Sequence, residues 1–132
     1  GPGKRHGWGE GRSAGRGAQR GVAADRMLRH ADVLELTSDQ VGKLEMLSYE
    51  ARKKMIDLRA SIEKEQLELK NRIRSDAEDM EQIKRHLSAI AKAKVGIQEV
   101  KISNMFVARK ILTDEQKELV KERHPRMGMN LD

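Results

Sequence analysis

The side chains that most often carry chemistry in proteins are sparse in this sequence. It holds four histidines and no cysteine, which excludes thiol nucleophiles, thiolate metal sites and disulfides. Side-chain catalysis needs a nucleophile, a base and an orienting group held together in a water-poor pocket. Here the histidines are scattered, and the carboxylates alternate with Lys and Arg along polar stretches. We therefore expect no enzyme and nominate no catalytic residue.

Metal binding is the second chemistry that these side chains suggest. His30 stands near Asp32 and Glu35, and His124 is followed by Met127. Neither group has the close ligand spacing of an established metal motif. The sequence therefore requires no cofactor, and it leaves His30, His124 and Met127 as the residues to test if a metal ion is bound.

Basic residues are concentrated at the start of the chain. Of the formal net charge of +6, residues 1–24 supply +4, from five Lys and Arg against Glu10 alone, and eight of the eleven glycines lie there too. Such a composition buries too little apolar surface to fold. It predicts a flexible basic tail over residues 1–24, either a solvated leader or an arm that binds nucleic acid.

The rest of the chain has the composition of long helices. Its 132 residues are the size of one domain, 37% are hydrophobic and 36% charged, and only 2% are aromatic. No run of 18 apolar residues is present, so no membrane insertion is expected. We predict an all-α domain over residues 25–124 and a frayed tail over 125–132, because Pro125 ends the last helix.

Two helix starts are strongly signalled. Thr37 and Gln40 have the spacing of a capping box, in which the Thr side chain accepts from the backbone of the third helical residue and the Gln side chain reaches back. Thr113 and Gln116 repeat it about 75 residues later. The first box opens a long helix and the second a short one.

A stripe of apolar residues at alternating three- and four-residue steps follows the first box. It comprises Val41, Leu44, Ala51, Met55, Leu58, Ile62 and Leu69, with Ser48 and Glu65 as polar exceptions. This spacing predicts a helix of about 35 residues that buries one seam. Ser75 and Glu78 predict the cap of a second long helix, whose seam is Met80, Ile83, Leu87, Ile90 and Ile97. The short connection makes the pair an antiparallel hairpin.

The apolar pattern broadens between residues 95 and 107. Apolar side chains there occupy more than one face of the helix, which indicates burial beyond the hairpin seam. The simplest source of that burial is a second chain. We therefore expect Ile102, Met105 and Phe106 to form a homodimer interface.

The chain contains two Leu-Thr-x-x-Gln pentapeptides about 75 residues apart. In this feature it resembles the Spy/CpxP family of bacterial periplasmic proteins. The matching positions are Leu36, Thr37, Gln40, Leu112, Thr113 and Gln116, and the similarity extends over about residues 26–124. The resemblance implies a curved, cradle-like antiparallel homodimer in the periplasm. It also implies an envelope-stress role as an ATP-independent chaperone for unfolded envelope proteins, and for some members restraint of a sensor kinase. The two pentapeptides are then helix-capping devices.

Long helices with mixed charge also suggest how clients would bind. Cations attract unfolded chains and modest apolar contacts hold them. The candidate client contacts are Arg52, Lys53, Arg59, Lys64 and Lys70 on the first long helix and Lys84, Arg85, Lys92, Lys94 and Lys101 on the second.

The same superfamily includes heavy-metal resistance proteins and sensors of the ZraP/CnrX type, for zinc, nickel, cobalt or copper. In the nickel and cobalt sensors a His and a Met one turn apart precede the second pentapeptide. Here those positions are Asn104 and Ala108, which are poor ligands. His30 precedes the first pentapeptide without a partner His within a turn. A metal sensor of this superfamily and a nucleic-acid-binding protein are the two alternatives to the chaperone.

Overall fold

The computed structural model describes residues 22–75 and 78–123, and within these ranges the protein is helical with no strand. The helices are α2 (Ala23–Arg29), α3 (Ala31–Leu34), α4 (Ser38–Arg74), α5 (Met80–Ile111) and α6 (Asp114–Arg123). The all-α prediction is confirmed. No helix in the described ranges combines the length and apolarity needed to cross a bilayer.

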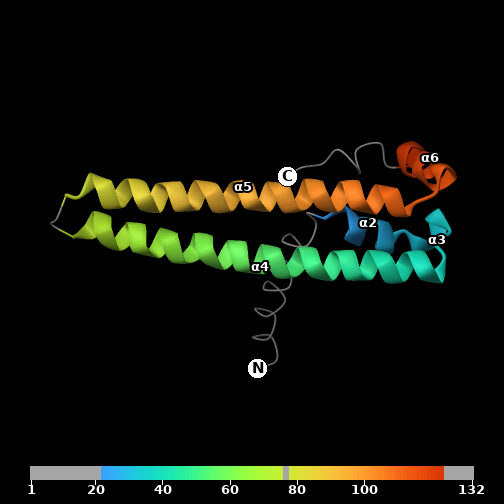
Figure 1. Ribbon diagram of the computed structural model, residues 1–132, viewed down its shortest axis with the longest axis horizontal. Coiled ribbons are helices and arrows are strands. Elements are labelled where there is room, and N and C mark those ends of the chain that lie inside the picture. Colours follow the sequence, from blue (N-terminus) through green and yellow to red (C-terminus); the bar gives the residue numbers. More distant parts are fainter. Residues whose placement is uncertain (1–21, 76–77, 124–132) are drawn as a thin grey trace, which may run out of the picture.

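The two long helices lie side by side and form a rod (Figure 1). Contacts join Gln40 to Ile111 at one end and Glu65 to His86 further along. Because residue numbers rise on α4 as they fall on α5, the helices are antiparallel. The 37 residues of α4 span about 55 Å at the usual helical rise.

The apolar seam of α4 faces α5, as its periodicity predicts. Leu44, Ala51 and Met55 are buried, whereas Leu58 and Leu69 are only half-buried. The burial of the seam differs along α4 because the short helices lie at one end of the rod, where they add a further layer (Figure 1). At the other end the described residues form a two-helix ribbon of α4 and α5 alone (Figure 1).

The main core therefore lies at the end that holds α2, α3 and α6. Met27, Leu34 and Leu44 are its largest fully buried side chains, and they pack with Met105 and Ala108 of α5. A second, smaller cluster joins Val22 to Ala51 and Met55. Burying this surface stabilises the rod at one end much more than at the other.

The start of α5 differs from the prediction. Ser75 ends α4: its hydroxyl donates to the carbonyl of Arg72 at 2.9 Å, so it is used at a C-terminus and does not cap the next helix. Asp79 is the N-cap of α5, and its carboxylate accepts from the backbone N–H of Gln82 at 3.3 Å. Ser and Asp are both good caps. Local sequence alone does not choose between two of them four residues apart.

The boundary of the predicted tail also needs correction. Val22, Ala23 and Ala24, which were placed in the flexible segment, are buried, and α2 already begins at Ala23. Their small apolar side chains pack against the two long helices, an outcome that the surrounding Gly/Arg composition hides. Residues 1–21 and the tail predicted over 125–132 lie outside the described residues.

Met105 is not available to a second chain. It is 8% exposed and belongs to the core formed with α2, α3 and α4. The breadth of the apolar pattern on α5 therefore has a source within the chain, because α5 packs against α2 as well as α4. Ile102 is half-buried and Phe106 is 53% exposed, so of the three expected interface residues Met105 was wrongly assigned.

Candidate functional site

Both pentapeptides form the capping boxes that the sequence predicts. The backbone N–H of Gln40 donates to Thr37 Oγ1 at 3.1 Å, and the backbone N–H of Thr37 donates to Gln40 Oε1 at 3.0 Å. Thr113 and Gln116 make the same two bonds at 3.1 and 2.9 Å. Each box satisfies two backbone donors that a helix start leaves unpaired.

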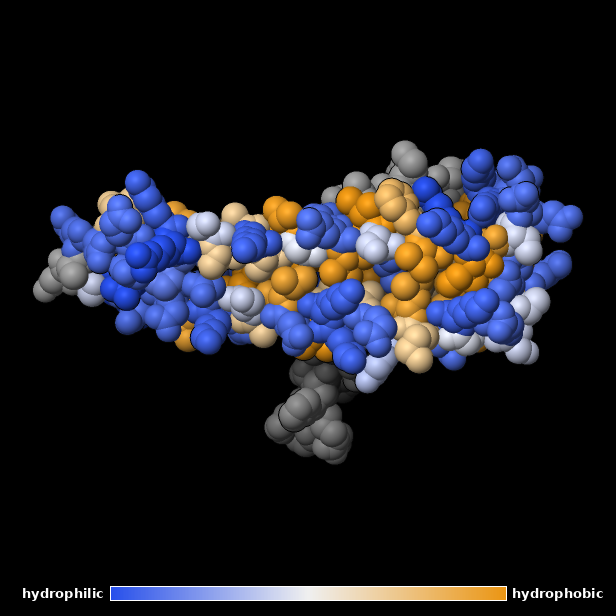
Figure 2. Space-filling model, viewed as in Figure 1, coloured by the Kyte–Doolittle hydropathy of each residue, from blue (hydrophilic) through white to orange (hydrophobic). Residues whose placement is uncertain are grey.

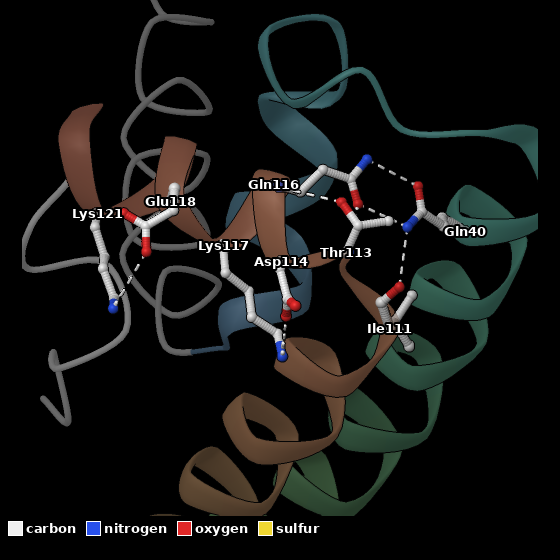
Figure 3. Close-up of polar contacts among 8 residues, drawn as sticks. All are labelled: Gln40, Ile111, Thr113, Asp114, Gln116, Lys117, Glu118 and Lys121. Carbon is white, nitrogen blue, oxygen red and sulfur yellow. Dashed lines mark hydrogen bonds and ion pairs between the residues drawn. The ribbon is translucent and has the colours of Figure 1, made fainter.

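The two glutamines also bond to each other, which links the two boxes (Figure 3). Gln40 Nε2 donates to Gln116 Oε1 at 2.7 Å, and Gln116 Nε2 donates to Gln40 Oε1 at 3.0 Å. Gln40 Nε2 donates further to the carbonyl of Ile111. Gln116 Nε2 donates to the carbonyls of Leu34 and Glu35. We call this arrangement the amide clasp.

The amide clasp joins four helix ends: the starts of α4 and α6 and the ends of α3 and α5. Gln40 and Gln116 are 8% and 7% exposed, and every donor and acceptor of their amides has a partner. Buried polar groups that are fully paired specify a unique arrangement, whereas unpaired ones are costly. The bonds of the clasp hold these four helix ends together. The sequence reveals each box but not their contact, although two identical buried motifs are the signal that could have suggested it.

α2 is anchored on the rod by a buried carboxylate. Asp25 is 6% exposed and accepts a hydrogen bond from Ser48 Oγ, while Arg52 Nη2 lies 3.2 Å from its other oxygen. Ser48, a polar exception in the seam, is thus the hydrogen-bond partner of a buried charge. On the same short helix, burial lowers the pKa of Arg26, with Arg29 acting in the same direction and Asp25 opposing it. Arg52, which is an expected client contact, also holds α2, and its side chain remains 50% exposed.

Asn104 supplies the second anchor of α2. Its Oδ1 accepts the buried backbone N–H of Ala24 at 2.9 Å, and its Nδ2 lies 3.4 Å from the carbonyl of Leu47. A His at this position, as in the nickel and cobalt sensors, would not reproduce this pair of bonds. Asn104 is therefore a structural residue that sequence reasoning evaluated only as a poor metal ligand.

Of the remaining metal candidates, the described residues include His30 alone. His30 lies between α2 and α3, and His124 and Met127 fall outside the described residues. Across residues 22–75 and 78–123, no group of three or more His, Asp or Glu is arranged to hold a metal ion.

The other polar exception of the seam also has a partner across the rod. His86 Nδ1 lies 2.7 Å from Glu65 Oε1, at a level where no third described helix lies over α4 and α5 (Figure 1). Glu65 and His86 stand where the seam would otherwise place apolar side chains of α4 and α5 against each other. Their polar contact joins the two helices in a region where little apolar surface is buried.

The expected client cations separate into two groups. Lys101 is only 8% exposed, so it is not a surface contact and that assignment was wrong. It occurs on the buried side of α5, one turn before Met105. Lys53 is exposed and lies over the ring of Tyr49, 4.9 Å from its centroid. The side chains of Arg59, Lys64, Lys70, Lys84, Arg85, Lys92 and Lys94 are exposed.

Positive charge is distributed unequally between the long helices. α5 carries seven Lys and Arg against two Glu, whereas α4 carries nine against seven acidic residues. Most of the basic excess of the described residues thus belongs to α5. This helix, more than α4, would attract an acidic or unfolded chain.

An open groove runs between the two long helices. It holds about 520 Å³ and is lined by Lys54, Asp57 and Leu58 of α4 and by Gly96, Glu99, Val100 and Ser103 of α5. A Cβ on Gly96 would lie 3.0 Å from Leu58 Cδ2, so the glycine allows the helices to approach closely here. Figure 2 shows apolar side chains along the line where the long helices meet, bordered by hydrophilic ones.

The open groove and α2 occupy opposite faces of the rod. Lys54 lines the groove, and Arg52, two residues earlier, contacts α2. Two residues correspond to about 200° around a helix, which places these side chains on opposite sides of α4. One face is therefore covered by α2, and the groove face is not covered by any other described helix.

No family model, curated protein or solved structure matches this chain. The resemblance to the Spy/CpxP family accordingly rests on the two pentapeptides. The geometry gives a structural reason why the two pentapeptides occur together in one chain: each supplies one glutamine of the amide clasp.

Proposed function

We propose that this protein is an ATP-independent chaperone of the bacterial periplasm, acting in envelope stress as a homodimer that binds unfolded proteins on α5 and the open groove. The observation that carries the proposal is the combination of a basic excess on α5 with exposed apolar side chains on the same helix. The two capping pentapeptides support the family and the compartment.

The proposed binding surface is the outer face of α5, formed by Arg85, Lys92, Val95, Phe106 and Lys110. These positions recur close to multiples of the helical period, so they share one side of the helix. Val95 and Phe106 are 56% and 53% exposed, and the three cations are also exposed. The open groove continues this surface toward α4 through Ser103 and Val100.

The arrangement is suited to loose binding of many sequences. A surplus of positive charge attracts acidic or extended chains over about 10 Å in physiological salt. Separate apolar side chains then add modest contacts without an enclosed pocket, since the groove is shallow. Weak and distributed contacts let a client fold while it is bound and leave without ATP.

The test is suppression of aggregation of a reduced, denatured client protein by the purified chain, without ATP and in the presence of a chelator. The variant Arg85→Glu/Lys92→Glu should weaken suppression at least threefold. The matched control is Lys43→Glu/Lys121→Glu, which changes the net charge equally on α4 and α6 and should behave as the parent. Both control lysines are exposed.

The outcomes separate the alternative functions. Loss of protection in both double variants would mean that only net charge matters and would contradict an α5 site. Protection that appears only with added zinc, nickel, cobalt or copper would favour the metal-responsive function, with His30 as the first residue to replace. Tight RNA binding that disappears on deletion of residues 1–21 would favour the nucleic-acid function.

A further inference from the structure

The side of α4 that faces away from α5 carries a second apolar stripe. Its members, which we call the outer stripe, are Met46, Tyr49, Lys53, Ile56, Ala60, Glu63 and Leu67. They recur at alternating steps of three and four residues, the spacing of a coiled-coil seam. The four large apolar members are 57–68% exposed.

Among the described residues, the outer stripe takes no part in the packing between helices. Tyr49 and Lys53 each lie two residues from the buried Ala51, and Ile56 and Ala60 each lie two from Leu58. A two-residue step is about 200° around a helix, so the outer stripe is opposite the seam. In Figure 1 α4 forms one edge of the molecule, and α5 and the short helices lie away from that edge. A helix that belonged only to this rod would need one apolar stripe, and α4 has two.

We propose that the outer stripe binds the outer stripe of a second copy of this chain, with the two α4 helices antiparallel about a two-fold axis. The arrangement that pairs the charges places Lys53 of each copy opposite Glu63 of the other. Tyr49 then faces Leu67, and Ile56 faces Ala60. Each of these contacts occurs twice, so the surface is self-complementary in both charge and apolarity.

The flanking charges modulate this pairing. Glu50 on one border of the outer stripe comes beside Lys64 of the second copy, which is favourable and also occurs twice. Close to the two-fold axis, Asp57 lies near Asp57 of the second copy, and Arg59 lies near Arg59 of the second copy. These two contacts between like charges are unfavourable. The pairs of opposite charges within and beside the outer stripe thus select the register of the two helices. The like charges near the axis limit the affinity of the dimer.

This interface rests on the homodimer of the proposed function and relocates its contact from α5 to α4, whereas client binding on α5 is measured separately by suppression of aggregation. The outer face of α5 and the open groove then remain accessible in the dimer. A dimer through α4 would carry two basic surfaces on its far sides.

The test is a charge exchange followed by sedimentation equilibrium of the full chain between 1 and 200 µM. Lys53→Glu and Glu63→Lys should each weaken the dimer at least about tenfold, because each places two like-charged pairs in the seam. The double variant Lys53→Glu/Glu63→Lys should recover most of the lost affinity. Both positions are exposed, and far-UV circular dichroism checks that α4 stays folded.

The matched control is Lys54→Glu, which makes the same charge change one residue away in the open groove and should alter the dissociation constant less than twofold. Three results would overturn the proposal. They are a parent chain that is monomeric at 200 µM, a double variant that stays as weak as the single ones, and a dimer that Phe106→Asp abolishes while the Lys53 and Glu63 variants do not affect it.

Discussion

Replacing Gln116 tests whether the amide clasp stabilises the whole fold or only one helix start. The change Gln116→Leu removes the cap bond to Thr113, both amide bonds to Gln40 and the donor to the carbonyls of Leu34 and Glu35. Loss of a cap costs about 1 kcal/mol. Leaving buried polar groups without partners adds about 1–3 kcal/mol. The free energy of unfolding should therefore fall by about 3 kcal/mol, a large share of the stability of a small domain.

The change Gln116→Glu separates the two contributions. A Glu at this position still accepts from the Thr113 backbone, so it preserves the capping box. Its carboxylate donates nothing to Leu34 or Glu35 and meets the Gln40 oxygen unfavourably. We expect a loss of about 2 kcal/mol at neutral pH although the cap is intact.

The pH dependence of the Glu variant has a defined sign. Burial among carbonyls disfavours the charged carboxylate, so the pKa of the introduced Glu should be raised above its value in the unfolded chain. The variant should then regain stability as the pH falls through this raised pKa, because a protonated carboxyl donates one hydrogen bond. The parent chain has an amide at this position and should not show the effect.

Urea unfolding followed by circular dichroism at 222 nm measures these free energies. A double-mutant cycle with Gln40→Leu and Gln116→Leu should give a coupling energy of about 1–2 kcal/mol, since two direct bonds join the amides. The reasoning is refuted if Gln116→Glu is as stable as the parent, or if Gln116→Leu costs no more than Thr113→Ala.

Three further substitutions have expected outcomes. Gly42→Ala should raise stability by about 0.5–1 kcal/mol in thermal unfolding, because Gly42 lies within α4 and its added Cβ would meet open space; a lower melting temperature would contradict this. Asn104→Ala should cost about 1–3 kcal/mol and speed hydrogen exchange in α2, because the buried Ala24 N–H loses its acceptor; unchanged exchange would show that α2 is held by other contacts. Thr37→Ala should cost about 1 kcal/mol without changing chaperone activity per folded molecule, and an activity loss at unaltered stability would instead indicate direct contact with a partner.

The placement of the second long helix shows where local signals are insufficient. Ser75 and Asp79 are both residues that cap helices well, and the sequence favoured Ser75 because Glu78 follows it at the box spacing. In the structure Ser75 bonds backward to Arg72 and Asp79 bonds forward to Gln82. The choice depends on where α4 stops against α5, which is a property of the packed pair.

The α5 residues expected at surfaces show a related limit. The broadened apolar pattern assigned Met105 to an interface, and its charge assigned Lys101 to a surface, yet both are buried. Burial of this side of α5 depends on α2, a helix of only seven residues. A helix that short gives no periodic signal strong enough to locate the face it covers.

What the sequence determined by itself is local: two capping boxes, one seam of three- and four-residue steps and the all-α class, because each depends on groups within a few residues or on a period repeated many times. What only the tertiary structure decided is long-range: the bonds of Gln40 to Gln116, of Ser48 to Asp25 and of Asn104 to Ala24. These partners lie 23 to 80 residues apart along the chain. A buried polar group requires a partner but does not specify which one, and only the packing of all the helices supplies it.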